Sequence, residues 1–305
     1  MISIVQLEYI VAVDRYKNIQ KAAEKSYVSQ PALSMQIKKV EEELEIQIFD
    51  RRKHPIEATK IGKDFIKQAK LVLDEHQKLK RMVERSKNDF QGEINIGVIP
   101  TVANYLVTDL YQINRRALPN LTFNIYELKT NEVIDALKSR AIDMGIISGP
   151  FASKNLQIHP LFYEPILIYG KNRGTHFLIE DLEEYRPWLL KEGNCLRNQM
   201  VNFCDLRGQS QSNTMYEGNS LQTLIDLIEI DDGFTLLPEL SVEHLKLNPD
   251  NIYEFKDSIP ARNIIALSQK RNANEAIIHL ISESIRGLKK DYLNEDSAFD
   301  LVEWD

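Results

Sequence analysis

The chain has 305 residues, 43% of them hydrophobic and 27% charged, and a formal net charge of -7 at pH 7. No stretch is long and apolar enough to span a membrane, and the N-terminus lacks a signal-peptide pattern, so we expect a cytoplasmic protein with no membrane partner. The net negative charge argues against nucleic-acid binding over the whole surface, but one locally basic domain remains compatible with it.

The first predicted elements are two short helices joined by a tight connection. Asn18 is a plausible N-cap for a helix over 19–26, and Ser29 can cap a second helix that has Pro31 in its first turn. The second helix carries an apolar stripe at helical spacing: Leu33, Ile37, Val40 and Leu44. This arrangement predicts a helix-turn-helix whose second helix lies in the DNA major groove. An ordinary helical hairpin is the alternative.

The outer side of the second helix carries five residues that could reach DNA: Gln30, Pro31, Ser34, Met35 and Lys38. A basic cluster follows shortly after this helix: Arg51, Arg52, Lys53 and Lys60. Because a DNA-reading module depends on its local field, this cluster outweighs the negative charge of the whole chain.

A long helix is predicted over 59–89, because the segment after Gly62 lacks Gly and Pro and is rich in Lys, Glu, Gln and Leu. Its apolar positions follow the spacing of a coiled-coil seam with one histidine: Phe65, Ala69, Val72, His76, Leu79 and Val83. We expect this helix to dimerise, so that two reading heads meet a DNA site of two-fold symmetry. Packing of the helix on its own domain is the alternative.

Strands and helices alternate in the remainder of the chain. Strands are predicted at 94–99, 121–126, 144–147, 165–169, 233–238 and 263–267, and helices from about 102, over 133–140 and over 273–288. The alternation predicts an α/β fold with a largely parallel sheet and helices on both faces, and its length favours two lobes. Ligands of such sheets lie at the C-terminal ends of strands, which places Thr101 and Thr130 at the candidate cleft.

The only two cysteines, Cys195 and Cys204, stand nine positions apart. In a helix their Cα atoms would lie roughly 13 Å apart, whereas a disulfide needs about 7 Å or less, so a bridge would unwind the segment. The pair is either a redox switch or two inert buried residues. It is not a Cys-x-x-Cys motif, and no histidine stands at ligand spacing from either cysteine. A reducing cytoplasm also argues against a lasting structural disulfide.

Residues 4–62 closely resemble the signature of LysR-type transcriptional regulators. The matching positions are Ala22-Ala23, the run from Val28 to Lys38, Glu41, Glu43-Leu44, Phe49 and Arg51. The resemblance implies a winged helix-turn-helix in which Gln30, Pro31 and Ser34 face bases, while Lys38, Arg51 and the wing residues Arg52 to His54 meet phosphates. His54 stands where most members have a second wing arginine.

The same resemblance implies an architecture for the whole chain. We expect residues 1–58 to form the DNA-binding domain, 59–89 the linker and dimerisation helix, and 90–305 a regulatory domain resembling a type 2 periplasmic binding protein. Chain crossovers near residues 162 and 264 divide that domain into lobe I (90–161 and 265–305) and lobe II (162–264).

Within the family, the chain most resembles the sensors of hydrogen peroxide. The matching segments are 97–102, Glu127 with Thr130, 192–199 with Cys204, 233–238 and Arg262. This resemblance implies that peroxide reacts with the thiolate of Cys195, and that the resulting sulfenic acid condenses with Cys204 as the resolving thiol.

Four further residues are implied to bind or activate peroxide: Thr101, Thr130, Asn194 and Arg262. The threonines would hold peroxide by hydrogen bonds, and Arg262 or Arg197 would lower the pKa of the Cys195 thiol. Asn194 stands where the family usually has histidine, so no imidazole charge is supplied there. Thr101 as a mere helix cap, Arg262 in a surface ion pair and Arg197 in solvent are the alternatives.

The implied function is a redox-sensing regulator of the peroxide response. Its implied partners are promoter DNA, hydrogen peroxide, RNA polymerase, a thioredoxin- or glutaredoxin-type reductant and further copies of the chain in a homodimer or homotetramer. We expect no cofactor, no metal and no enzymatic turnover. Three alternatives remain: a LysR-type regulator of a small metabolite with bystander cysteines, a thiol peroxidase, and a constitutive repressor or architectural DNA binder.

Overall fold

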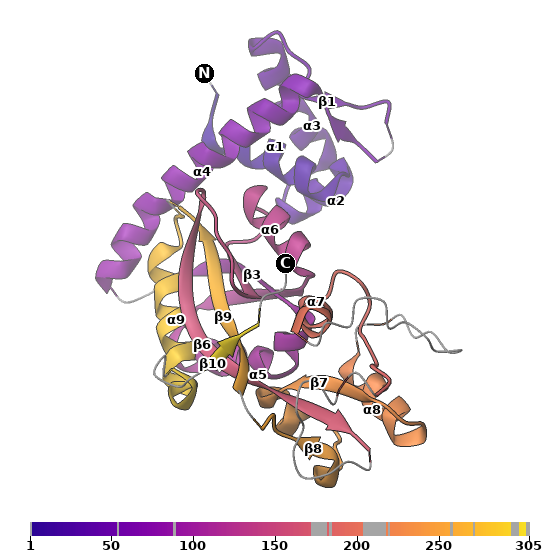
Figure 1. The fold of residues 1–305 in the computed structure, drawn as a ribbon. Coiled ribbons are helices and arrows are strands. Elements are labelled where there is room, and N and C mark those ends of the chain that lie inside the picture. Colours follow the sequence, from indigo (N-terminus) through magenta and orange to yellow (C-terminus); the bar gives the residue numbers. More distant parts are fainter. Residues whose placement is uncertain are drawn as a thin grey trace. The chain divides into compact units, whose positions relative to one another are not determined.

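The computed structural model describes residues 2–53, 55–87, 90–171, 182, 185–203, 218, 220–256, 259–270, 272–293 and 299–302. The chain forms two compact units (Figure 1), one from residues 1–88 with 139–141 and the other from 89–138 with 142–305. Within the described ranges, no helix combines the length and apolar character needed to cross a bilayer. The same ranges contain no cluster of three or more His, Cys, Asp and Glu suited to hold a metal ion.

Three helices open the N-terminal unit: α1 (Ile4–Tyr16), α2 (Ile19–Lys25) and α3 (Gln30–Glu43). Each begins at a polar cap, because the side-chain oxygens of Ser3, Asn18 and Ser29 accept backbone N–H groups of the first turns. These N–H groups have no partner inside the helix, so the caps fix where each helix starts. The predicted caps Asn18 and Ser29 are confirmed.

The predicted apolar stripe of α3 lies in the core of this unit, with one exception. Leu33, Ile37 and Val40 are buried in a cluster with residues of α1 and α2. Leu44 is 36% exposed, because α3 ends at Glu43 and Leu44 is its C-cap. The prediction that Leu44 continues the buried stripe is therefore wrong.

A two-stranded wing follows α3. β1 (Phe49–Asp50) and β2 (Glu57–Ala58) pair antiparallel, and α4 (Lys60–Lys87) starts directly after them. Gly62 in the first turn of α4 permits a close approach, since a Cβ at this position would lie 2.0 Å from the backbone oxygen of Ile48. The unit is a winged helix-turn-helix followed by a long helix, as predicted.

The long helix α4 buries only part of the predicted seam. Ala69 is buried within the unit, whereas Val72 and Leu79 are 39% and 65% exposed. Exposed apolar side chains along one helix suit packing against a second helix. Dimerisation through α4 stays a prediction.

The second unit is built on an eight-stranded sheet with the order β4-β3-β5-β9-β6-β7, in which β10 also pairs with β9 and β8 with β6. Its strands are β3 (Gly92–Val98), β4 (Leu121–Glu127), β5 (Met144–Ser148), β6 (Leu156–Gly170), β7 (Phe234–Pro238), β8 (Ile252–Tyr253), β9 (Ile259–Gln269) and β10 (Phe299–Leu301).

Parallel pairing is confined to part of this sheet. β3 is parallel to β4 and β5, and β10 to β9, whereas β9 is antiparallel to β5 and β6, and β6 to β7 and β8. The prediction of a largely parallel sheet is therefore wrong, because four of the five strand pairs beyond β3–β4 and β3–β5 are antiparallel and the β9–β10 pair is parallel. The reason is that the chain runs out along β6 and returns along β9, so these two neighbours must point in opposite directions.

Helices and short 3-10 segments cover the sheet: α5 (Pro100–Ala117), α6 (Thr130–Lys138), α7 (Cys195–Phe203), α8 (Leu221–Ile230), η2 (Glu239–His244), η3 (Pro249–Asn251), α9 (Glu275–Leu288) and η4 (Lys290–Tyr292). Figure 1 shows α9 beside β6 and β9, against which it packs. One large buried cluster includes residues of β3, β5, α5 and α9, and separate clusters surround β7 and α8. The two-lobed α/β fold is as predicted.

The predicted bounds of the two lobes stay a prediction. Residues 299–302 belong to lobe I in that scheme, yet β10 pairs with the start of β9 at Ile259–Ala261. Val302 packs in the same cluster as Ile166 and Phe234. The C-terminal end of the described chain therefore lies on the core of β6 and β7.

Gly62→Ala should lower the free energy of unfolding of the N-terminal unit by about 1–3 kcal/mol, because the added methyl group collides with backbone that cannot move aside. Gly287→Ala in α9 is the matched control, since no atom lies within 4 Å of its would-be Cβ. Urea unfolding followed by circular dichroism checks both variants. Equal midpoints for Gly62→Ala and the parent chain would contradict the assigned close approach.

Candidate functional site

The start of α3 presents the residues predicted to reach DNA. Ser29 caps the helix, and Pro31 occupies its first turn, where a missing backbone N–H costs no hydrogen bond. Of the five predicted residues, Ser34 is half-buried and the others are exposed: Gln30, Pro31, Met35 and Lys38. The structure thus leaves these side chains accessible, and their contact with bases stays a prediction.

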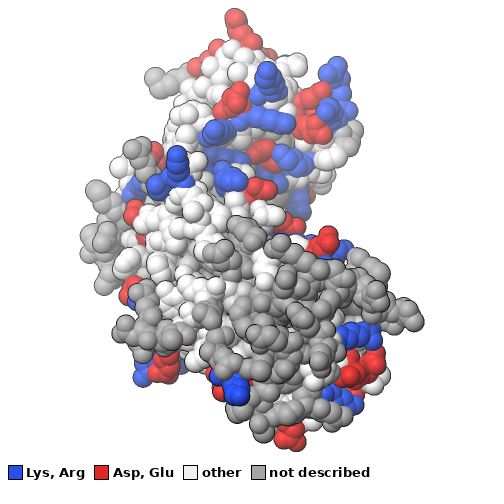
Figure 2. All heavy atoms as spheres, viewed as in Figure 1, with Lys and Arg blue, Asp and Glu red and all other residues white. Residues whose placement is uncertain are grey.

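The basic residues of the reading surface pair with acids of the same unit. The ion pairs are Lys38 with Glu42 at 3.3 Å, Arg51 with Glu41 at 3.0 Å, Arg52 with Asp50 at 3.0 Å and Lys53 with Glu57 at 2.5 Å. Figure 2 shows Lys and Arg gathered on the visible face of this unit with Asp and Glu among them. Exposed ion pairs are weak because water screens them, so phosphate oxygens can replace these carboxylates.

Two wing residues keep their full positive charge. Hydrogen bonding to Asp50 raises the pKa of Arg52, and hydrogen bonding to Glu57 raises the pKa of Lys53. Both side chains are therefore cations at any pH at which DNA is double-stranded, and they can serve the predicted phosphate contacts.

Glu41 connects the recognition helix to the wing. Its Oε1 accepts the backbone N–H groups of Ile48 at 2.8 Å and Phe49 at 3.2 Å, and its Oε2 accepts from Arg51 Nη2 at 3.0 Å. One carboxylate thereby fixes the first residues of the wing and the direction of Arg51.

The turn between α2 and α3 holds a residue that sequence reasoning missed. Tyr27 is 96% exposed and has a φ of 55°, a conformation that bulky side chains rarely adopt. An aromatic ring is thus held in solvent just before the Ser29 cap. The signal in the sequence was a tyrosine in a connection too short to bury it.

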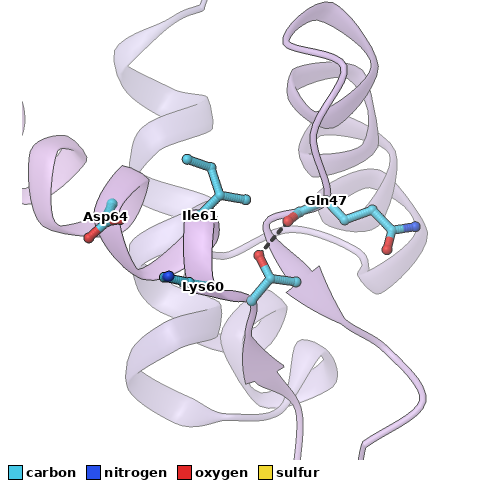
Figure 3. Close-up of a pocket in the computed structure, with 5 residues that line it drawn as sticks. Gln47, Lys60, Ile61 and Asp64 are labelled. Carbon is cyan, nitrogen blue, oxygen red and sulfur yellow. Dashed lines mark hydrogen bonds between the residues drawn. The ribbon is translucent and has the colours of Figure 1, made fainter.

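A cavity lies where the wing joins α4 (Figure 3). It is lined by Gln47, Thr59, Lys60, Ile61 and Asp64. The Thr59 hydroxyl donates to the backbone oxygen of Gln47 at 2.6 Å and accepts the N–H of Gly62 at 3.0 Å. Both hydrogen bonds of the Thr59 hydroxyl are made to the surrounding backbone. We therefore interpret the cavity as a structural feature of the junction and not as a ligand site.

Cys195 is the first residue of α7 and is buried, with 4% of its surface exposed and no disulfide. Just before it, the Oδ1 atom of buried Asn194 accepts the N–H of Leu196 at 3.0 Å. Asn194 therefore supports the start of α7 as a capping side chain does. A role of Asn194 in binding or activating peroxide stays a prediction.

Thr101 and Arg262 lie beside the thiol. Thr101 Oγ1 is 4.0 Å from Cys195 Sγ, and Arg262 donates from Nη1 to Thr101 Oγ1 at 2.8 Å and from Nη2 to the Thr101 carbonyl at 3.0 Å. Ile99 is the N-cap of α5, so Thr101 is not its cap. Arg262 is fully buried, which excludes the alternative of a surface ion pair.

Thr130 is the first residue of α6 and is also buried. Among the described residues its Oγ1 has no hydrogen-bond partner, although the hydroxyl lies near enough to Cys195 to lower the pKa of the thiol. A buried hydroxyl without a partner costs about 1–3 kcal/mol. A small polar ligand beside the thiol would satisfy it.

Burial raises the pKa of the Cys195 thiol above its ordinary value, while Arg262, Thr101 and Thr130 lower it without overcoming this effect. Arg262 acts in the predicted direction and lowers the pKa of the thiol, but desolvation raises it by more. The role of Arg262 in the reaction stays a prediction. Arg197 points elsewhere: its Nη1 donates to the Leu190 carbonyl at 3.2 Å and its Nη2 lies 3.8 Å from Glu192.

Two buried residues next to Arg262 were missed by sequence reasoning. Tyr105 donates to Glu164 Oε2 at 2.8 Å, and Arg262 Nε donates to the same oxygen at 2.9 Å. Burial raises the pKa of Glu164, and Arg262 followed by the Tyr105 hydroxyl lowers it. An acid inside the apolar run 161–169 was the available signal.

Cys204, predicted to be the resolving thiol, and His54 of the wing lie outside the described residues. The helix α7 continues from Cys195 to Phe203. The pairing of the two cysteines stays a prediction.

Arg52→Ala should weaken DNA binding and reduce the slope of log affinity against log salt concentration by about 0.9, the value of one lost phosphate contact. The matched control is Lys138→Ala, which removes an exposed cation paired with Asp135 in the second unit. Fluorescence anisotropy over a series of salt concentrations measures both. An unchanged slope for Arg52→Ala contradicts its assignment to phosphate.

The alkylation of Cys195 should follow a raised pKa. In a Cys204→Ser background, the rate with iodoacetamide at pH 7 should be lower than for an exposed cysteine, because less of the thiol is ionised. Arg262→Met should move the midpoint of the rate–pH curve further upward, since Arg262 favours the thiolate. Arg197→Met is the control and should leave the midpoint in place; a midpoint below that of free cysteine would contradict the assignment.

Two family models match most of the chain. Residues 4–63 match the bacterial regulatory helix-turn-helix protein of the lysR family, and residues 87–287 match the LysR substrate binding domain.

Named proteins resemble the chain over most of its length. The HTH-type transcriptional regulator EstR of Acinetobacter baylyi is 25% identical over 290 residues, covering 93% of this chain and 96% of EstR. The hydrogen peroxide-inducible genes activator of Dickeya chrysanthemi is 32% identical over 252 residues, covering 81% and 82%. A full-length OxyR variant from Pseudomonas aeruginosa has a similar structure, with a TM-score of 0.79, 28% identity and coverage of 94% and 95%.

Proposed function

The chain belongs to the LysR family of bacterial helix-turn-helix transcriptional regulators, and from that premise we propose that it regulates transcription in response to hydrogen peroxide through Cys195. Residues 1–58 read double-stranded promoter DNA, 59–89 pair two chains, and 90–305 sense the oxidant. The protein acts in the cytoplasm, where its DNA is.

One observation carries this proposal: three distant segments bring polar groups to a single buried thiol on a fourth segment. Thr101 comes from α5, Thr130 from α6, Arg262 from β9 and Cys195 from α7. The hydroxyl of Thr130, which has no hydrogen-bond partner among the described residues, and the hydroxyl of Thr101 are donors for a peroxide molecule lying against the sulfur. The named relatives from Dickeya chrysanthemi and Pseudomonas aeruginosa support peroxide as the ligand.

The reaction follows from these groups. The Cys195 sulfur attacks one peroxide oxygen, the O–O bond breaks, and the other oxygen leaves as hydroxide, which takes up a proton to become water. Arg262 and Thr101 offer N–H and O–H groups to the negative charge that develops. The sulfenic acid at Cys195 then condenses with the Cys204 thiol and releases a second water. In total, the two thiols give up two protons and two electrons, which reduce one peroxide to two water molecules.

The disulfide drives a change of shape. Along an intact α7 the two Cα atoms would lie roughly 13 Å apart, so bond formation must unwind the end of the helix. Gln199 anchors α7 by donating from Nε2 to Ser148 Oγ at 3.0 Å and to the Val302 carbonyl at 3.1 Å. Unwinding withdraws Gln199 from both partners and exposes their buried oxygens. The changed regulatory domain then alters how α4 presents the two recognition helices.

The assembly and reset complete the proposal. Two α4 helices pair along their exposed apolar positions to form a homodimer, and two dimers form a homotetramer on a two-fold symmetric site. The DNA-bound protein contacts RNA polymerase, and a thioredoxin- or glutaredoxin-type reductant restores the two thiols. One peroxide is consumed per switching event, so the protein is a regulator and not an enzyme.

A second candidate is a LysR-type regulator that binds a small metabolite, with inert cysteines. It is compatible with the likeness to EstR, a transcriptional regulator whose name does not mention peroxide and which matches 93% of this chain. The raised pKa of Cys195 also suits an inert residue. The two candidates differ in whether Cys195 is needed for the transcriptional response.

Peroxide treatment of the full chain should form a Cys195–Cys204 bridge and change the DNA footprint together. Mass spectrometry of the digested protein detects the loss of two hydrogen atoms in the linked peptides, and DNase footprinting reports DNA binding on the same sample. Cys195→Ser should abolish both changes.

The outcomes separate the candidates. Unbridged cysteines with an unchanged footprint overturn the peroxide proposal, and a promoter response that survives Cys195→Ser favours a metabolite inducer. Sustained peroxide consumption with excess reductant would indicate a thiol peroxidase. Oxidation without any effect on footprint or transcription would indicate a constitutive DNA binder.

A further inference from the structure

Glu164 is the one fully buried acid in the described part of the chain, and it faces the candidate sensor site through Arg262. It stands on β6 directly opposite Arg262 on β9, and both side chains have no exposed surface. Removing two charges from water is expensive, and a well-packed apolar pair at such a place is often as stable or more stable. Stability alone therefore does not account for this ion pair.

The contacts of Glu164 fix its charge state. Its Oε2 accepts from Arg262 Nε at 2.9 Å and from the Tyr105 hydroxyl at 2.8 Å, and lies 2.8 Å from Arg262 Nη2, while its Oε1 accepts the backbone N–H of Leu240 at 3.2 Å. Burial raises the pKa of Tyr105 well above its ordinary value, and Glu164 adds to this, so Tyr105 stays protonated and donates. Since every partner is a donor, Glu164 is a carboxylate.

The carboxylate determines which way the guanidinium points. With Nε and Nη2 directed at Glu164, the Nη1 of Arg262 is directed at Thr101 Oγ1. An oxygen that accepts from Arg262 turns its own hydrogen elsewhere, and the sulfur of Cys195 is 4.0 Å away. Thr101 thus accepts from Arg262 and keeps its own hydrogen available for the sulfur or for a ligand beside it, while in the Thr101–Cys195 contact itself either atom can be the donor.

The charge of Arg262 is a separate matter from the direction of its N–H groups. Arg262 lowers the pKa of the thiol, but burial raises it by more, so the charge of Arg262 alone does not keep Cys195 ionised. What the pair supplies is a set of aimed donors. Directed donors assist the breaking of an O–O bond, because they stabilise the hydroxide that leaves. The reaction with iodoacetamide releases iodide, which needs no such donor.

We propose that Glu164 is a positioning residue of the Cys195 site: it holds Arg262 so that Thr101 presents its hydroxyl hydrogen to the sulfur and to the peroxide bound there. Glu164 neither gives nor receives a proton in the reaction. The inference rests on the proposed peroxide function and adds a residue to it.

The test compares two reactions of the same thiol in the full chain with Cys204→Ser. The rate of sulfenic acid formation with hydrogen peroxide, trapped by dimedone and followed by intact-mass spectrometry, is divided by the rate of alkylation with iodoacetamide at the same pH. This ratio cancels the ionised fraction of Cys195, and the control variant described next accounts for the different access of the two reagents. Glu164→Gln should lower the ratio about tenfold or more, as misplaced catalytic groups do.

Two further variants complete the design. Glu229→Gln is the matched control, because Glu229 also accepts from a tyrosine and an asparagine, Tyr169 and Asn251, but has no contact with Arg262; its ratio should stay within about threefold of the parent. Glu164→Asp keeps the charge on a shorter side chain and serves if Glu164→Gln does not fold. It should lower the ratio as well, because the carboxylate no longer reaches both nitrogens.

The outcomes are distinct. A ratio for either Glu164 variant equal to that of Glu229→Gln overturns the positioning role. The contact of Glu164 with Arg262 would then have no effect on the reaction with peroxide beyond that of losing any carboxylate. If the parent chain itself fails to form sulfenic acid with peroxide, the proposed function fails first. In a Thr101→Val background, Glu164→Gln should lower the rate ratio little further, because both residues act through the Thr101 hydroxyl. A further drop in the ratio as large as in the parent background would also overturn the proposal.

Discussion

The ion pair of Glu164 and Arg262 crosses the two strands that connect the lobes of the regulatory unit. β6 carries the chain out and β9 carries it back, and the pair lies where they run side by side. Tyr105 of α5 and the backbone of Leu240 in η2 donate to the same carboxylate. A single buried charge thus gathers four segments, and one of them, β9, supplies the arginine that contacts Thr101 beside the thiol.

The thiol site combines a dry environment with directed donors. Burial disfavours the thiolate of Cys195, while the surrounding hydroxyls and Arg262 favour it. A site of this kind does not hold a permanently ionised, generally reactive cysteine. Under the proposed function, its selectivity comes from groups that act when a small oxidant enters. Gln199 holds the helix that carries the cysteine through its hydrogen bonds to Ser148 and Val302.

Local signals were sufficient to predict the N-terminal unit. The caps Asn18 and Ser29 and the buried stripe of α3 depend on neighbours within a few residues. Leu44 lies outside the buried stripe because α3 ends at Glu43, an end that the apolar spacing alone did not indicate. The antiparallel course of β6 and β9 was missed because alternation of strands and helices carries no information on strand direction once the chain crosses between lobes.

The thiol site was only partly readable from the sequence. Family resemblance supplied Cys195, Thr101, Thr130 and Arg262, and the structure brings them together. Glu164 and Tyr105 were missed, since their partners lie 98 and 59 positions away in the chain. The lowering effect of Arg262 on the pKa of Cys195 was expected, but the larger effect of burial was not, because desolvation depends on the complete fold around a group.

The paired cations of the winged unit have a consequence for how the protein searches a chromosome. Random DNA offers mainly phosphates, and these must first displace Glu41, Glu42, Asp50 and Glu57 from their basic partners. Each exposed pair is weak, so the cost of displacing one carboxylate is small and is the same on every sequence. The predicted base contacts would be the part that differs between an operator and unrelated DNA. Ion pairing within the winged unit lowers the affinity for non-specific DNA only slightly. The ratio of specific to non-specific affinity then depends mainly on base contacts.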